Sequence, residues 1–218
     1  GRKMACSVSR DLKDYAWIKN RKPFAAKAPV IRNYIAKLNV SQMPRSKFEF
    51  TNENKLMFPK AKLTKGDLLN YYRQIAPLML PYLKDRPLTL ERLPDGLTSK
   101  SAPHFWQKNT PDYYPSWIKR IVLPTLKERD VAYALVNDVD SLLYLANQGC
   151  VAFHIYESRI GSLDRPDFVL FDLDPGTGSM GHTAKIANVL HELLEDAKAG
   201  AFIKTSGKRG LHIFSPWK

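Results

Sequence analysis

The chain has 218 residues, 44% of them apolar or aromatic, and a formal net charge of +13. This length and composition suit one substantial hydrophobic core or two small ones, and argue against a chain that is disordered over most of its length. Apolar stretches stay well short of the roughly 20 residues of a membrane-spanning helix, and the first ten residues, GRKMACSVSR, lack the apolar segment of a signal peptide. We therefore expect no membrane partner and a cytoplasmic location near the nucleoid.

Positive charge is concentrated in the first 50 residues, which hold 12 lysines and arginines against three acids, a net charge of +9. Such a segment attracts phosphate polyanions and releases their counterions, although a solvated basic face or a ribosome-like or membrane-surface tail has the same composition. Aromatic residues are interleaved with the charges, which predicts short helices. We interpret residues 1–48 as a basic, helical N-terminal extension and residues 49–218 as the main domain.

The next segments along the chain have the signals of a helix followed by strands. TKGDLLNYYRQIAPLMLPYLKD, residues 64–85, has a capping box at Thr64 and Asp67 and apolar residues at helical spacing, with a kink expected at Pro77. PLTLERLP alternates like a strand and ends in the turn residues PDG.

The second half of the chain repeats this alternation of strands and helices. We predict a helix over 140–152 capped by Asp138 or Asp140, and a second helix over 182–199. The predicted strands are VAYALV at 131–136, DFVLFDLD at 167–174, and two short strands about a glycine-rich turn within 201–217. This order predicts an α/β fold with mixed sheets. Cys6 and Cys150 lack metal-ligand spacing and are expected to be reduced, non-catalytic thiols.

FDLDPGTG, residues 171–178, places Asp172 and Asp174 at the end of an apolar run. Successive side chains of a strand alternate between faces, so the two carboxylates share one face and Leu173 points to the other. Such a pair suits two divalent ions that clamp the attacking and leaving oxygens in phosphoryl or nucleotidyl transfer. The alternative is a strand that simply ends in an Asp-Pro-Gly turn.

KTSGKRGLHIF, residues 204–214, combines two glycines with Ser206, Lys208, Arg209 and His212. Glycines let backbone N-H groups approach an anion, and the side chains add positive charge and donors, so the segment suits a triphosphate. A hairpin with a basic turn and a histidine satisfied on a strand explains the same residues.

Two further stretches contain candidate nucleic-acid contacts. In HFWQKN, Phe105 and Trp106 stand beside Lys108, and on a strand one ring can join the core while the other stacks on a base; core packing of both rings is an equal alternative. His154, in AFHIY, has the alternative of a satisfied core histidine.

Several of these segments, in their order and spacing, resemble the polymerase domain of bacterial DNA ligase D and its archaeal relatives in the archaeo-eukaryotic primase superfamily. The resemblance covers residue 50 to the end and rests on six segments: TNENKLMFP, TKGDLLNYY, RPLTLERLPDG, FWQKN, FDLDPG and TSGKRGLHIFSP. It implies a primase-polymerase-like core with an RRM-like module at the C-terminus. The implied activity is template- and primer-dependent addition of nucleotides at breaks repaired by non-homologous end joining, with Ku and a DNA ligase as partners.

The resemblance also implies roles for individual residues. Asp172 and Asp174 would be catalytic and hold the metals, Mn²⁺ or Mg²⁺. The residues implied to bind the NTP or dNTP are Ser206, Lys208, Arg209, His212, His154 and Arg92. Those implied to bind DNA, including a 5′-phosphate at an end or gap, are Asn52, Lys55, Lys65, Phe105, Trp106 and Lys108.

The chain departs from the family pattern at three places. Glu91 precedes Arg92 where many relatives have a basic pair, and Arg209 replaces the usual lysine, which keeps the charge but changes its geometry. The family also has a third metal-binding aspartate further along, so we expect the RRM-like module to be incomplete in these 218 residues. Two alternatives to a repair polymerase follow: a module that binds 5′-phosphorylated DNA ends with weak or no catalysis, and a primase that starts strands unaided.

Overall fold

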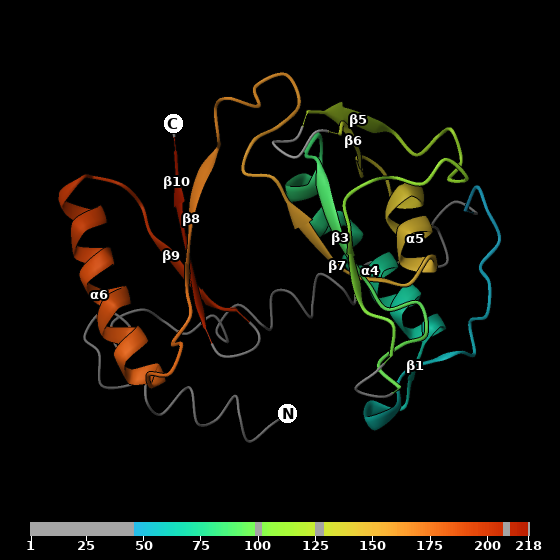
Figure 1. Cartoon of the computed structure of the whole chain (residues 1–218), viewed down its shortest axis with the longest axis horizontal. Helices are drawn as coiled ribbons and strands as arrows, with labels where there is room; N and C mark the ends of the chain where they lie inside the picture. Colours follow the sequence, from blue (N-terminus) through green and yellow to red (C-terminus); the bar gives the residue numbers. More distant parts are fainter. Residues whose placement is uncertain (1–45, 99–101, 125–128, 207–209, 218) are drawn as a thin grey trace. The chain divides into compact units, whose positions relative to one another are not determined.

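The computed structural model describes residues 46–98, 102–124, 129–206 and 210–217, and these form two compact units that divide between Leu163 and Asp164 (Figure 1). We call the described residues 46–163 the α4/α5 unit and 164–217 the α6 unit, and describe each by itself. The helices expected in the basic extension lie outside the described residues, and the boundary at residue 48 stays a prediction.

The α4/α5 unit is an antiparallel sheet with two long helices. Its elements are β1 (Leu56–Phe58), η4 (Pro59–Ala61), β2 (Leu63–Thr64), α4 (Lys65–Leu83), β3 (Leu88–Arg92), β4 (Phe105–Gln107), β5 (Arg120–Leu123), β6 (Val131–Ala134), α5 (Val139–Asn147) and β7 (Cys150–Ile155). Strand β3 pairs with β4, β6 and β7, and β5 extends the sheet from β6. Strands β1 and β2 form a separate ribbon.

Both helices of this unit begin at caps that the sequence predicts. The Thr64 hydroxyl accepts from the Asp67 N-H at 3.2 Å and the Asp67 carboxylate accepts from the Thr64 N-H at 2.8 Å, which completes the capping box of α4. Asp138 caps α5 by accepting from the Ser141 N-H at 2.7 Å. Helix α5 ends at Asn147, short of the predicted residue 152, because Gly149 takes a left-handed φ of 81° and β7 begins directly after it.

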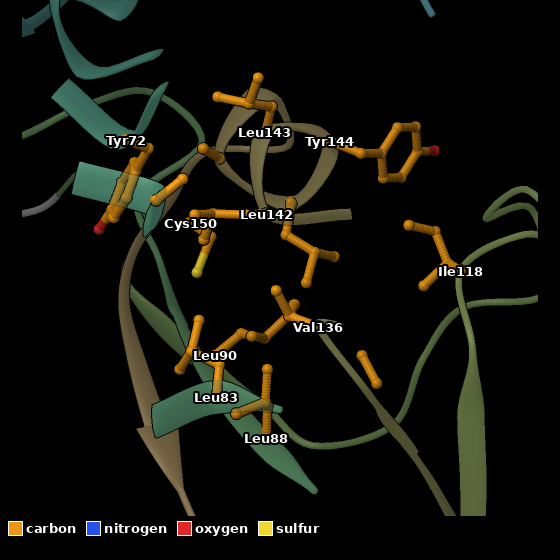
Figure 2. Packing of buried hydrophobic residues seen from close by; sticks show 14 of the residues in the cluster. Tyr72, Leu83, Leu88, Leu90, Ile118, Val136, Leu142, Leu143, Tyr144 and Cys150 are labelled. Atoms are coloured by element: carbon orange, nitrogen blue, oxygen red, sulfur yellow. The ribbon is translucent and has the colours of Figure 1, made fainter. Parts of the chain in front are cut away.

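The core of the α4/α5 unit lies between the helices and the inner face of the sheet (Figure 2). Leu88 and Leu90 point inward from β3 and meet Leu142 from α5 and Leu83 from α4, all at most 2% exposed. Cys150 is a free thiol in this core, and burial raises the pKa of its thiol, which removes it as a nucleophile. This burial supports the non-catalytic role expected for Cys150, which stays a prediction; Cys6 lies outside the described residues.

The α6 unit is a three-stranded antiparallel sheet with one helix. Its elements are β8 (Phe168–Leu173), α6 (Met180–Asp196), β9 (Phe202–Thr205) and β10 (Leu211–Pro216). Strand β10 lies between β8 and β9 (Figure 1). Its buried residues Leu211 and Ile213 pack with Ala187 of α6. The Ser179 hydroxyl accepts from the His182 N-H at 3.2 Å and caps the helix, which therefore starts slightly before the predicted residue 182.

Both units confirm the predicted α/β fold, and every strand pairing among the described residues is antiparallel. The strands expected in the second half of the chain are present as β6, β8, β9 and β10. Among the helices that the structure describes, none combines the length and the apolar character needed to cross a membrane.

Replacing Leu142 by alanine tests the core of the α4/α5 unit. Leu142 is fully buried, so the change should lower the free energy of unfolding by about 2–5 kcal/mol through lost burial and a residual cavity. Leu97→Ala is the matched control, since Leu97 is 57% exposed and its removal should cost less than about 0.5 kcal/mol. Urea unfolding measures both, and equal destabilisation by the two variants would contradict this core.

Candidate active site

The paired carboxylates stand on the open face of the α6 unit. Asp172 and Asp174 are exposed, whereas Leu173 between them packs toward the α6 side of the sheet, which confirms the predicted alternation. The structure also confirms the turn of the alternative interpretation: the Gly178 N-H donates to the Pro175 carbonyl at 2.7 Å. The strand end and the exposed carboxylate pair coexist, so the turn does not argue against a site.

Strand β10 brings His212 directly opposite Asp172. The two residues are register partners, and the His212 Nε2 lies 3.3 Å from the Asp172 Oδ1. The imidazole thus stands beside the carboxylate, and the two form an ion pair when His212 is protonated. His212 therefore orients one of the two carboxylates from a strand that is distant in sequence.

Ser206 and Gly210, which flank residues 207–209, are joined by two hydrogen bonds. The Ser206 N-H donates to the Gly210 carbonyl and the Gly210 N-H donates to the Ser206 Oγ, both at 2.9 Å. Lys208 and Arg209, which the sequence places between them, lie outside the described residues. Gly210 lies beside the carboxylates, because it directly precedes Leu211, the register partner of Leu173.

Gly210 approaches the end of β8 so closely that a side chain does not fit. An added Cβ would lie 2.7 Å from the Asp174 Oδ1 and 2.7 Å from the Leu173 carbonyl oxygen. The Asp174 carboxylate can occupy this position only because residue 210 has no side chain.

Asp172 and Asp174 fit a divalent cation by the chemistry of their donors. Mg²⁺ and Mn²⁺ prefer carboxylate oxygens together with water and phosphate oxygens. Within the described ranges there is no cluster of three or more histidine, cysteine, aspartate or glutamate side chains arranged as metal ligands. A cation held by these two residues would take its other ligands from water or from phosphate groups.

A second polar group lies on the open face of the α4/α5 unit, where β4, β3 and β7 adjoin. Glu91 of β3 has its Oε1 2.8 Å from the His104 Nε2 and its Oε2 3.6 Å from the His154 Nε2. The Trp106 ring is centred 4.4 Å from the His154 ring. His154 is not a core histidine, since 46% of its side chain is exposed.

The next residue of β3 points the other way. Arg92 is only 8% exposed, and its guanidinium donates to the Gln148 carbonyl at 2.6 and 2.9 Å and to the Gln107 Oε1 at 2.5 Å. It also stands over the Phe105 ring, 5.2 Å from the centroid. A nucleotide contact by Arg92 would have to replace these bonds, and its predicted role stays a prediction.

The adjacent aromatic residues divide between the two faces of β4, as the strand pattern predicts. Phe105 lies against Arg92 and Trp106 against His154, and they remain 41% and 54% exposed. Neither ring is a core residue. Lys108 is exposed just after the end of β4.

The predicted 5′-phosphate residues gather at the first turn of α4. The Lys65 Nζ donates to the Thr51 Oγ1 at 3.0 Å, and the Lys55 Nζ donates to the Asp95 carboxylate at 2.7 Å and to the Pro94 carbonyl at 2.8 Å. Asn52 is exposed, takes a positive φ of 53°, and its carbonyl accepts from the Lys55 N-H at 2.9 Å.

Lys65 is an unusual cation, because it is only 6% exposed. Burial, followed by the positive charge of Lys55, lowers the pKa of Lys65 to about 8, against a smaller opposing effect of Glu53. A buried ammonium beside a second ammonium at a helix N-terminus is an environment that an anion would stabilise.

His104 and Glu91 are members of the second group that the sequence did not single out as site residues. The signal was present in part: His104 is two residues from Trp106, and Glu91 lies between the inward Leu90 and Arg92. What the sequence could not show is that β4 and β7 both pair with β3, which brings His104, Glu91 and His154 into contact.

Comparison with known proteins shows the family to which the chain belongs. The sequence profile described as LigD, primase-polymerase domain, matches residues 64–218. The multifunctional non-homologous end joining protein LigD of Mycolicibacterium smegmatis is 31% identical over 169 residues, 76% of this chain and 22% of that protein. The bifunctional non-homologous end joining protein LigD of Bacillus subtilis is 32% identical over 184 residues, 84% of this chain and 29% of that protein.

A solved structure agrees with the sequence relatives. The polymerase domain from Mycobacterium tuberculosis ligase D in complex with DNA matches with a TM-score of 0.70 and 30% identity, over 80% of this chain and 62% of that chain. The chain belongs to the LigD primase-polymerase domain family, which confirms the resemblance read from the sequence. It spans under a third of the length of the two LigD relatives.

Gly210→Ala tests the close approach that positions Asp174. The added methyl group would collide with the Leu173 backbone, and we expect a loss of about 1–3 kcal/mol in the free energy of unfolding together with a displaced Asp174 carboxylate. Gly200→Ala in the same unit is the control, since its Cβ would meet nothing closer than 3.8 Å. Urea unfolding and Mn²⁺ titration followed by electron paramagnetic resonance measure the two effects, and wild-type values for Gly210→Ala would contradict the close approach.

Proposed function

We propose that this chain catalyses template- and primer-dependent nucleotidyl transfer and fills gaps at double-strand breaks during non-homologous end joining. The observation that carries the proposal is the pair Asp172 and Asp174, exposed on one face at the end of β8 with His212 3.3 Å from Asp172. Membership in the LigD primase-polymerase domain family supports it, as does the likeness to a polymerase domain solved with DNA.

The carboxylates and their neighbours have distinct parts in this reaction. Asp172 and Asp174 would hold Mn²⁺ or Mg²⁺, which when bound neutralises charge on the transferring phosphoryl group and activates the primer 3′ hydroxyl. His212, 3.3 Å from Asp172, would restrain the direction of that carboxylate. Ser206 and Gly210 anchor both ends of the segment that contains Lys208 and Arg209, whose cationic side chains suit the triphosphate of an incoming NTP or dNTP.

The group at the first turn of α4 would bind the DNA end. Asn52, Lys55 and Lys65 are proposed to recognise the 5′-phosphate on the downstream strand, since the lysines supply positive charge beside a helix N-terminus. Trp106 offers an exposed ring for a base, and Lys108 a cation for the backbone. Ku and a DNA ligase are the proposed partners, because the relatives are end-joining proteins.

A module that binds phosphorylated DNA ends without catalysis is the second candidate. The observation that favours it is that Lys55 and Lys65 belong to one compact unit, and Asp172 and Asp174 to the other. End binding through Lys55 and Lys65 therefore needs nothing from the carboxylates. Two exposed carboxylates favour catalysis, because a protein that only binds phosphates gains nothing from negative charge near them.

Replacing Asp172 by alanine separates the two candidates. We expect the wild-type chain to extend a labelled primer on gapped DNA bearing a downstream 5′-phosphate in a Mn²⁺-dependent manner. Asp172→Ala should abolish extension, because a metal ligand is lost, while leaving DNA affinity unchanged. Gel analysis of primer extension and fluorescence anisotropy measure the two properties.

The control for this experiment is Asp196→Ala, which removes an exposed carboxylate at the end of α6. It should leave both extension and DNA binding at wild-type levels. Binding without extension by the wild-type chain would favour the end-binding module, and equal loss of binding and extension in Asp172→Ala would count against the polymerase.

The lowered pKa of Lys65 predicts a pH-dependent preference for phosphorylated ends. Lys65 is cationic below its pKa of about 8 and neutral above it, so the preference for a 5′-phosphate over a 5′-hydroxyl end should fall as the pH rises from about 7 to about 9. Lys65→Arg keeps its charge over this range and should show a nearly constant preference. Competition binding with the two DNA ends measures it.

The ionisation of Lys65 does not make the fold less stable over this pH range, so it cannot lower the preference for a 5′-phosphate by unfolding the chain. The pKa of Lys65 is lower in the folded than in the unfolded chain, where it has its ordinary value of 10.5, so the unfolded chain binds more protons between these values. The contribution of Lys65 to the free energy of unfolding therefore rises with pH above about 8. A preference that stays constant in the wild-type chain would remove Lys65 from the phosphate site.

A further inference from the structure

The group formed by His104, Glu91, His154 and Trp106 places one carboxylate between two imidazoles. Glu91 offers its two oxygens to different partners, Oε1 to the His104 Nε2 at 2.8 Å and Oε2 to the His154 Nε2 at 3.6 Å. Its side chain is 26% exposed, against 46% for each histidine. Glu91 is therefore the partly enclosed centre of the group and the histidines are its outer members.

The first contact determines the protonation of His104. An ionised carboxylate has no proton to donate, so the 2.8 Å hydrogen bond requires that the His104 Nε2 carries the hydrogen. This bond holds the Glu91 carboxylate in one direction. The conformational entropy of the Glu91 side chain is lost when it binds His104. Its second oxygen can therefore face His154 with little further loss of entropy.

The second contact and the neighbouring ring restrain His154 from two sides. Its Nε2 faces Glu91, and its ring lies 4.4 Å from the Trp106 ring at an interplanar angle of 56°. Nδ1 is then the ring nitrogen that is not directed at Glu91. His154 and Trp106 thus form an imidazole edge beside an aromatic face that is 54% exposed, an arrangement suited to a polar group and a base of the same nucleotide.

We propose that Glu91, anchored by His104, is a positioning residue that holds the His154 imidazole against Trp106 in the orientation in which it receives a nucleotide. This inference rests on the proposed function, because it assigns to Glu91 a part in nucleotide binding. Preorganisation removes the cost of ordering the imidazole when the nucleotide binds, so Glu91 acts on affinity without touching the ligand.

Variants of Glu91 in the whole chain test the inference by two readouts. The ¹⁵N chemical shifts of the imidazole nitrogens, recorded near pH 8 where an ordinary histidine is neutral, report which nitrogen carries the hydrogen. Calorimetric titration with α,β-methylene-ATP and Mn²⁺ measures nucleotide affinity. In the wild-type chain we expect the Nε2-H form at His104, whose Nε2 is hydrogen-bonded to Glu91, and measurable nucleotide binding.

Glu91→Ala should give a mixture of the two neutral forms at His104 and lower the nucleotide affinity about tenfold, the size of one charge-assisted hydrogen bond. The nucleotide affinity of Glu91→Gln should lie between those of the wild-type chain and Glu91→Ala. The amide oxygen of the glutamine can accept from one imidazole only, while its NH₂ group faces the other. This variant has the shape of the wild-type side chain and carries the test if Glu91→Ala does not fold. Glu49→Gln, which removes a carboxylate elsewhere in the same unit, should match the wild-type chain.

The outcomes distinguish failure of the positioning role from failure of the function on which it rests. An affinity in both Glu91 variants within roughly twofold of wild type would overturn the positioning role while leaving nucleotide binding intact. Unchanged imidazole ¹⁵N shifts in Glu91→Ala would overturn it as well. Failure of the wild-type chain to bind the analogue would overturn the proposed function and this inference together.

Discussion

The alternation of side chains along β3 is the constraint on which the α4/α5 unit depends. Because β3 pairs with β4, β6 and β7, its inward residues Leu88 and Leu90 meet both helices, while Glu91 between Leu90 and Arg92 faces outward. A shift of register by one residue would bury Glu91 and expose the leucines. The hydrophobic core therefore determines where the carboxylate stands, and with it the positions of the imidazoles around it.

The α6 unit uses the same principle at β8. Leu173 is held by the core under α6, and this anchors Asp172 and Asp174 on the opposite face. The antiparallel register with β10 then places His212 opposite Asp172 and Gly210 against the end of β8. The site and the core share the same strands, so stability and function cannot be varied independently at these positions.

Two buried cations show how differently the chain treats a charge away from water. Arg92 is buried, and hydrogen bonds from its guanidinium to Gln107 and Gln148 compensate for the loss of water. These bonds join β4 and the end of α5 to β3. Lys65 has the Thr51 hydroxyl as a hydrogen-bond partner and a second ammonium nearby, and its pKa is lowered accordingly. The first arrangement favours a structural role and the second favours binding of an external anion.

The sequence by itself determined the helices α4, α5 and α6, the strands β3, β6, β8, β9 and β10, the caps of α4 and α5, the shared face of Asp172 and Asp174, and the family, because these depend on neighbours within a few residues or on the order of short motifs. It did not single out the strands β1, β2, β5 and β7. It missed the early end of α5, where the left-handed Gly149 and the start of β7 overrode helical spacing. Only the tertiary structure decided that His154 is an exposed residue of the sheet, that Arg92 is buried, and that Glu91 bridges two histidines. Those facts depend on which strands pair and in which register. Strand pairing brings together residues such as His104 and His154, which are far apart in the sequence, and no local sequence pattern predicts that they lie close together.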